Sequence, residues 1–147
     1  MNVTYGLYQD AIKEFARSAH GHGQLVAATG RATLGTPLCG DLVRLQVAVT
    51  SGHIAAIAHV TKGCLLCRAA ASVLSLRAPR QDDAGIEVVT AGLESMLTNG
   101  APTPADWPEL SMFEPVRDYP SRHRCVLLPF RALLMALRAA PSFGNRS

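Results

Sequence analysis

Alternating side chains over residues 42–50 constrain the fold of this chain more than any other feature of its sequence. An alternation with a period of two is typical of a β-strand that buries one face and exposes the other. The apolar positions of this run are Val43, Leu45, Val47 and Val49. Ser51-Gly52 then predicts a tight hairpin turn into a second strand, residues 54–61. With residues 24–29 as a further strand, the chain is expected to form a small three-stranded antiparallel sheet.

Four other segments carry apolar residues at helical spacing. They are residues 5–19, 64–77 and 84–97, and a last helix after Cys125 that uses Phe130, Leu133, Leu134 and Leu137. Pro129 is expected in the first turn of this last helix, where proline is tolerated. Asn99-Gly100 is expected to end the third helix. The predicted fold class is therefore α+β, with helices packed on one small sheet.

The length and composition fit a single domain that spans residues 1–147. A hydrophobic fraction of 48% argues against disorder. A net charge of +3 and eight aromatic residues (one Trp, three Tyr, four Phe) argue against nucleic-acid binding, which favours a dense basic stripe interleaved with aromatics. The sequence shows neither a signal peptide nor an apolar run of membrane-spanning length, so we expect a cytoplasmic protein that binds no membrane.

In a reducing compartment, cysteines are more commonly metal ligands or reactive thiols than disulfide partners. Cys39 lies two residues before Asp41 on a turn, Cys64 opens a predicted helix, and Cys125 precedes the last helix. Because loop ends and helix starts can converge, these residues form a candidate zinc or iron site of three thiolates and one carboxylate. Arg124 could offset its negative charge. The alternative is that these cysteines only fill the core.

Cys64 and Cys67 also form a CxxC pair at the start of a predicted helix. The exposed N–H groups and the dipole of a helix start favour a thiolate, so we expect a lowered pKa for Cys64. Such pairs are typical of thiol-disulfide oxidoreductases, but there the pair follows a strand of a parallel βαβ unit, whereas a hairpin precedes it here. We therefore expect Cys67 to be a packed helix residue. Thiol-disulfide exchange remains an alternative function, as does a structural zinc module that binds a partner.

The histidines give weaker signals than the cysteines. His20 and His22 lie in a glycine-rich turn and could bind a metal, but a solvated loop is the favoured interpretation. His123 is a candidate spare ligand or proton carrier, although an exposed loop residue is the commoner case. His53 and His59 are expected only to cover the sheet.

Three motifs, in order along nearly the whole chain, resemble those of the NifU/IscU-type iron-sulfur cluster assembly scaffolds. The motifs are Thr36-Pro-Leu-Cys39-Gly-Asp41, Gly63-Cys64 running into Ala69-Ala-Ala-Ser72, and Arg117-Asp-Tyr-Pro120 through Arg122-His-Arg-Cys125. The long gap between Cys64 and Cys125, and the arginine directly before Cys125, are similar to the SufU branch in particular. Cys67 stands where these proteins usually carry a small or hydroxyl residue.

The resemblance implies an α+β fold of the SufE/NifU type and a site in which Cys39, Asp41, Cys64 and Cys125 bind zinc or a labile [2Fe-2S] cluster. It implies a cysteine desulfurase partner that delivers persulfide sulfur, with Cys125 as the candidate acceptor, and apo iron-sulfur proteins that receive the product. In the SufU branch the site holds zinc and the protein relays sulfur, whereas in the scaffold branch it builds the cluster. The expected function is iron-sulfur cluster assembly by a scaffold or sulfur-transfer protein.

Overall fold

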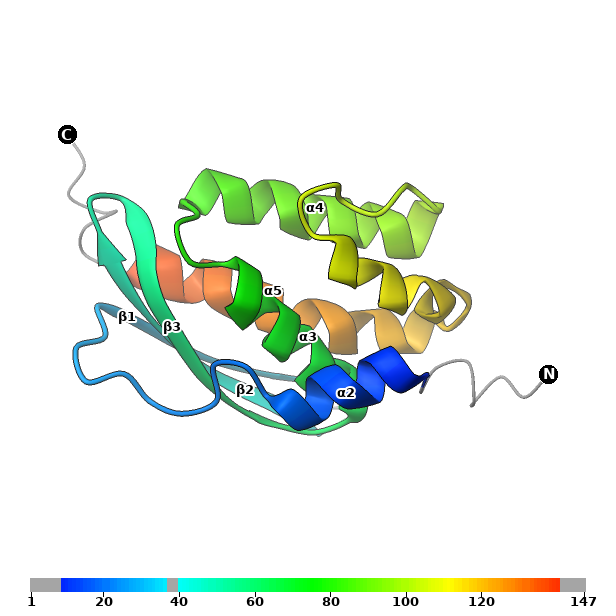
Figure 1. Ribbon diagram of the computed structural model, residues 1–147, viewed down its shortest axis with the longest axis horizontal. Helices are drawn as coiled ribbons and strands as arrows, with labels where there is room; N and C mark the ends of the chain where they lie inside the picture. The colour runs from blue at the N-terminus through cyan, green and yellow to red at the C-terminus, as the bar shows by residue number, and fades with distance from the viewer. Residues whose placement is uncertain (1–8, 37–39, 141–147) are drawn as a thin grey trace.

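A three-stranded antiparallel sheet of order β1-β2-β3 organises the computed structural model, which describes residues 9–36 and 40–140 (Figure 1). The strands are β1 Gly30–Thr36, β2 Asp41–Thr50 and β3 His53–Lys62. Ser51 and Gly52 have φ angles of 54° and 80° and join β2 to β3, as in two-residue turns that match the twist of a hairpin. The predicted alternation along β2 is confirmed, since Val43, Leu45, Val47 and Val49 are all buried. Asp41 is the first residue of this central strand.

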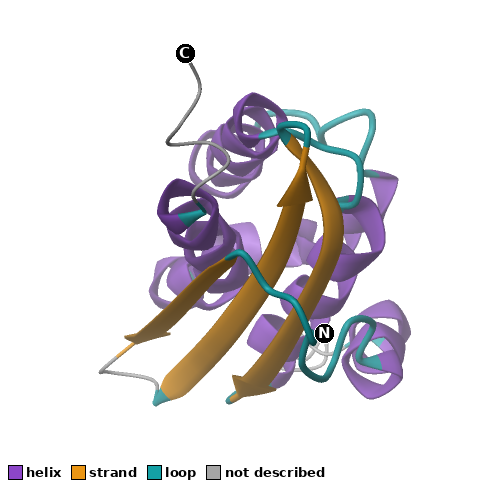
Figure 2. Cartoon of the chain, turned by 90° about the vertical axis from the view of Figure 1, so that its left-hand side faces the viewer, coloured by secondary structure: helices purple, strands orange, loops and turns teal. Residues whose placement is uncertain are grey.

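The first strand lies later in the chain than predicted. Residues 24–29 do not form it; they cross the outer face of the sheet, where the Leu25 N–H donates to Gln46 Oε1 at 2.7 Å (Figure 2). Gly30 begins β1, and the last helix approaches the strand closely at this glycine. A Cβ at Gly30 would overlap the carbonyl oxygen of Ala136. Helix packing therefore explains a glycine in an edge strand.

Helices cover one face of the sheet (Figure 2). The helices are α2 Asp10–Ser18, α3 Leu65–Arg77, α4 Asp83–Asn99 and α5 His123–Ala139, with 3-10 segments η1 Pro108–Asp118 and η2 Pro120–Arg122 between the last two. Helices α3 and α5 pack on the sheet, α2 packs against α3, and α4 packs against α5. The predicted α+β class is confirmed. None of the described helices is both long and apolar enough to span a membrane.

Two helix boundaries differ from the prediction, and one of them changes the position of a cysteine. Helix α5 begins at His123, so Cys125 lies in its first turn rather than before it, and Pro129 lies within the helix rather than at its start. Packing of α5 against the sheet and α4 outweighs the local preference of proline for a first turn. The first helix ends at Ser18, and the predicted residues 5–8 lie outside the described part of the chain.

Candidate metal centre

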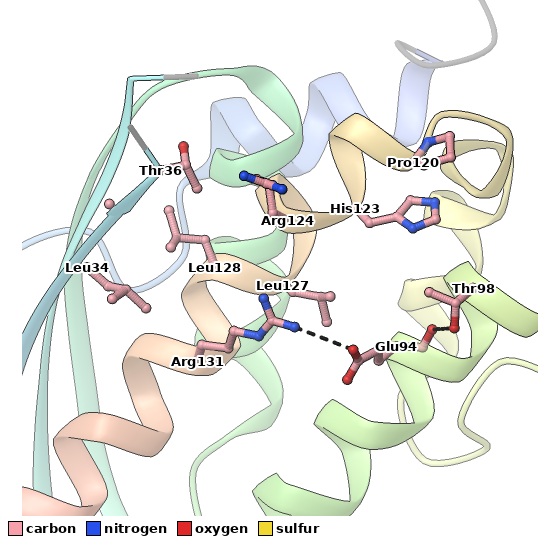
Figure 3. A pocket seen from close by; sticks show the side chains of 11 residues that line it. Leu34, Thr36, Glu94, Thr98, Pro120, His123, Arg124, Leu127, Leu128 and Arg131 are labelled. Carbon is pink, nitrogen blue, oxygen red and sulfur yellow. Dashed lines mark hydrogen bonds and ion pairs between the residues drawn. The ribbon is translucent and has the colours of Figure 1, made fainter. Parts of the chain in front are cut away.

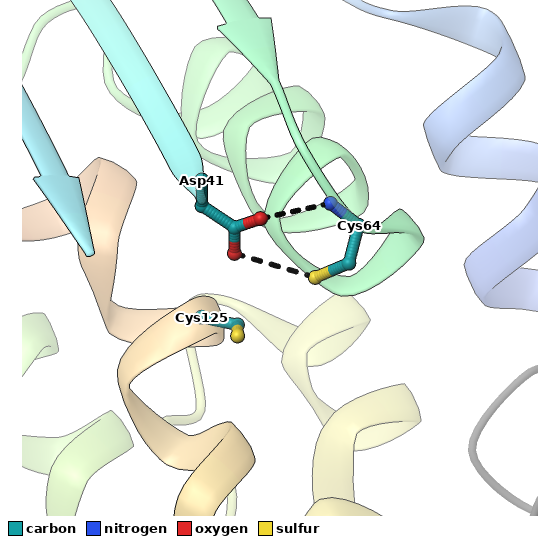
Figure 4. A group of neighbouring side chains, drawn as sticks. All are labelled: Asp41, Cys64 and Cys125. Atoms are coloured by element: carbon teal, nitrogen blue, oxygen red, sulfur yellow. Dashed lines mark hydrogen bonds between the residues drawn. The ribbon is translucent and has the colours of Figure 1, made fainter. Parts of the chain in front are cut away.

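Three of the four predicted ligands meet at one end of the sheet (Figure 4). Asp41 begins β2, Cys64 follows β3 as the N-cap residue of α3, and Cys125 lies in the first turn of α5. One ligand atom from each lies within 4.8 Å of the other two. Cys39 falls in the segment 37–39, outside the described residues. Elements far apart in the sequence thus bring two sulfurs and a carboxylate to one point.

The Asp41 carboxylate positions Cys64. It is 3% exposed; its Oδ1 accepts the Cys64 backbone N–H at 3.0 Å, and its Oδ2 lies 3.4 Å from the Cys64 Sγ. Gly63, with a φ of 143°, makes this approach possible, because a Cβ at that position would overlap the carboxylate. The glycine is therefore required both by its backbone conformation and by its contact.

The pKa of Cys64 is lowered to about 7, chiefly because the Cys125 thiol donates a hydrogen bond to the Cys64 thiolate. The backbone N–H of Cys67 acts in the same direction, whereas burial and the Asp41 charge oppose it. The same hydrogen bond, together with burial, raises the pKa of Cys125. A lowered pKa was predicted from the helix start, but the neighbouring thiol is the larger cause. Without a metal, Cys64 is therefore the thiol of this pair that ionises first.

The donor set fits a thiophilic metal. Bonds of about 2.0–2.3 Å in a tetrahedral site place the donor atoms roughly 3.3–3.8 Å apart. Donor atoms that already lie within 4.8 Å of one another need only small side-chain adjustments to reach that spacing. Two thiolates and a carboxylate suit zinc or iron rather than magnesium or calcium, and Cys39 is the predicted fourth donor.

A hollow of about 430 Å³ lies beside this site, between the end of β1 and helices α4 and α5 (Figure 3). Arg124 is exposed and lines it, so compensation of the ligand charge by Arg124 stays a prediction. Arg131 also lines it and lies 3.6 Å from Glu94 in an ion pair. The His123 Nε2 lies 3.1 Å from the Val116 carbonyl oxygen, so this half-buried ring binds η1.

Cys67 is fully buried in the core, as its packed position on the helix predicted. Burial is the main reason why its pKa is raised, and the negative charges of Asp41 and Cys64 act in the same direction. It is not one of the three residues whose ligand atoms converge. Cys67 thus remains a protonated thiol beside the candidate centre.

The sequence analysis missed a histidine cluster at the edge of β3, formed by His20, His22 and His59. The backbone of the predicted solvated loop pairs with this strand: the His59 N–H donates to the Gly21 carbonyl and the Gly23 N–H donates to the His59 carbonyl, both at 2.9 Å. Each ring nitrogen of His59 also has a partner at 2.8 Å, the His20 carbonyl oxygen or Thr61 Oγ1. The prediction of a solvated loop holds for the exposed side chains of His20 and His22 but not for the loop backbone, which is paired with β3. No local pattern indicates the contact of His59 with His20, which lies 39 positions away.

Known proteins resemble this chain along most of its length. The family model described as NifU-like N terminal domain matches residues 7–97. A Streptococcus pyogenes serotype M1 protein, described as iron-sulfur cluster assembly scaffold protein IscU, is 26% identical over 136 residues, which cover 90% of this chain and 83% of the relative. A Thermotoga maritima relative with the same description is 24% identical over 132 residues, which cover 90% of this chain and 93% of the relative. The crystal structure of a nitrogen-fixing NifU-like protein (N-terminal) from Brucella abortus superposes with a TM-score of 0.89 at 29% identity, covering 96% of this chain and 99% of that one.

Proposed function

This chain belongs to the NifU-like N-terminal domain family, and we propose on that premise that it is an iron-sulfur cluster assembly scaffold. The cluster would be held by Cys39, Asp41, Cys64 and Cys125. The observation that carries the proposal is the convergence of the last three, whose ligand atoms lie within 4.8 Å of one another. The names of the relatives point to the same process.

Asp41 makes this site suitable for a cluster that is passed on. A carboxylate oxygen is a harder donor than a thiolate and binds the iron of a cluster less strongly. Its Oδ1 stays occupied by the Cys64 N–H, which leaves Oδ2 beside the sulfurs as the exchangeable donor. We infer that the assembled cluster leaves through this weak position and passes to apo iron-sulfur proteins.

Sulfur is proposed to arrive as persulfide from a cysteine desulfurase. The family resemblance implies Cys125 as the acceptor, whereas the lower pKa of Cys64 makes it the better nucleophile before a metal binds. Cys64 is half-buried and Cys125 is fully buried, which also favours first contact at Cys64. Because the two sulfurs are in contact, a sulfane sulfur accepted by one can pass to the other.

The same four residues could instead hold zinc in a protein that only accepts and relays sulfur. Zinc would keep its cysteine ligands deprotonated. In both cases Asp41 orients Cys64 through the backbone N–H, and the half-buried Cys64 keeps the site open to a partner.

Metal and labile-sulfide analysis of protein purified without oxygen tests the proposal. The protein is then incubated with a cysteine desulfurase, cysteine and ferrous iron, and the analysis is repeated. Equal amounts of iron and sulfide, transferable to an apo-acceptor, support the scaffold. One zinc per chain that blocks cluster formation supports the sulfur relay. Cys67→Ala is the control variant and should behave like the unmodified protein in metal binding; the absence of metal, cluster and persulfide would overturn the proposal.

A further inference from the structure

Cys64 and Cys67 occupy the N-cap and the third residue of α3. The Cys64 side chain makes no capping hydrogen bond in α3, but the backbone N–H of Cys67 is one of the groups that favour the Cys64 thiolate. Helical geometry places the Cα atoms of residues three apart about 5 Å from each other, within the Cα separation of about 4.4–6.8 Å that a disulfide bridges. The start of α3 therefore gives the two cysteines a spacing that a disulfide can bridge.

The two thiols differ in their surroundings. Cys64 is half-buried and contacts Cys125 and Asp41, so it faces the candidate metal centre. Cys67 is 0% exposed and does not belong to the converging ligand group. An incoming partner can thus reach Cys64, while Cys67 is accessible only to a group already carried by its helix neighbour. Nothing in the proposed scaffold function uses Cys67.

We propose that Cys67 is an internal reductant that releases sulfide from a persulfide on Cys64. The inference rests on the proposed function, because a sulfur donor must first load the site. The inference adds one reaction to that function, the conversion of sulfane sulfur to the sulfide that a cluster contains. Cys67 then supplies electrons within the scaffold itself.

The reaction balances without an external oxidant. Transfer of the Cys67 proton to the outer sulfur of the Cys64 persulfide produces the thiolate that attacks the inner sulfur; a Cys64–Cys67 disulfide forms, and the bond to the outer sulfur breaks. The proton of the Cys67 thiol accompanies the outgoing sulfur, which leaves as hydrogen sulfide. The two thiols together supply the two electrons that reduce the sulfane sulfur to sulfide. A dithiol reductant restores both thiols before the next cycle.

The position of Cys64 gives this reaction a direction. Its sulfur lies within 4.8 Å of ligand atoms of Asp41 and Cys125, while its helix neighbour Cys67 belongs to the core. Attack from Cys67 expels sulfide on the side where the ligands converge. Sulfide is then produced where iron is proposed to bind, rather than in bulk solvent.

The test loads metal-free protein with glutathione persulfide, removes the excess, and measures sulfide released without added reductant. Thiols are then trapped and disulfides mapped by mass spectrometry. The unmodified protein should release sulfide and acquire a Cys64–Cys67 disulfide. Cys67→Ala should keep its persulfide and release sulfide at least about tenfold more slowly. A matched control, Cys67→Ala with Ala71→Cys, returns a thiol to the same helix roughly 10 Å along its axis from Cys64, too far for a disulfide, and should behave like Cys67→Ala.

Three outcomes would overturn the inference. They are unchanged release by Cys67→Ala, a Cys64–Cys125 disulfide in place of the expected one, and a stable persulfide with no disulfide in the unmodified protein. The last two are read on the unmodified chain, so they do not depend on whether a variant folds. A parallel experiment with a cysteine desulfurase and cysteine tests the proposed function separately: failure of the enzyme to load any cysteine contradicts sulfur acceptance, whereas the glutathione persulfide experiment still decides the role of Cys67.

Discussion

Asp41 and His59 are both buried polar residues of the sheet that bind a neighbouring chain segment, yet they leave different chemistry behind. Asp41 uses one carboxylate oxygen for the Cys64 N–H, and its second oxygen lies beside the sulfurs. His59 uses both ring nitrogens, one on the His20 carbonyl and one on Thr61, each at 2.8 Å. The first arrangement keeps a donor for a metal, and the second keeps none.

Residue type alone therefore does not make a metal site. Buried polar atoms must be satisfied, and a residue that satisfies all of its own atoms within the fold contributes stability rather than ligand capacity. His59 closes the segment that contains His20 and His22 onto the edge of β3. Asp41 instead orders the start of α3 while two sulfurs and an oxygen still converge.

The largest expected effect is the loss of metal on removal of a converging thiol. Cys64→Ala or Cys125→Ala should weaken zinc binding by more than about 100-fold, because each removes a ligand and not merely a supporting hydrogen bond. Competition with a chelator measures the affinity. His22→Ala is the control from the histidine cluster and should leave the zinc affinity unchanged. Loss of zinc binding in that variant would mean that the histidines, and not the cysteines, hold the metal.

Gly63→Ala should weaken zinc binding by roughly 10–100-fold, because the added Cβ displaces the Asp41 carboxylate. Gly23→Ala is a closely matched control. The φ angles of Gly63 and Gly23 are 143° and 139°, but a Cβ at Gly23 meets no atom within 4 Å. Both substitutions strain the backbone, and only the first disturbs a ligand. Equal losses of affinity would show that backbone strain, and not the Asp41 contact, controls the site.

Asp41→Ala should make an assembled cluster more persistent and slow its transfer to an apo-acceptor several-fold. The weak oxygen donor is removed, and the exchange path through it closes. The decay of the cluster absorbance and the rate of transfer measure both effects. Faster loss of the cluster would instead mean that Asp41 mainly holds it in place.

The parts of this molecule that the sequence predicted are those specified by local patterns. The alternation along β2 and the apolar spacing of α4 each identify an element from a single window of sequence. Strand β1 was misplaced because its identity depends on pairing with β2 and on close contact between Gly30 and α5. The cysteine motifs indicated the ligands, but the fit of Gly63 against Asp41 depends on residues 22 positions apart and has no local signature.

The smallest expected effect concerns the pH dependence of stability at His59. Burial is the main cause that lowers its pKa below 6.5; the His22 charge adds to this, and the His20 carbonyl opposes it. Arg17 and Arg68 also line the small hollow beside His59. The unfolded chain therefore binds more protons than the folded protein as the pH falls below about 6.5.

The contribution of His59 should be fully present above pH 6.5 and should decrease as the pH falls toward its lowered folded-state pKa. One such group changes the free energy of unfolding by at most about 1.4 kcal/mol per pH unit. Urea unfolding of the metal-free protein at several pH values measures this slope. His59→Gln keeps a neutral polar group but cannot titrate, so its slope should be shallower, whereas the exposed His53→Gln should retain the full slope. If both variants gave the same slope as the unmodified protein, protonation of His59 would not limit its attachment of the histidine segment to β3.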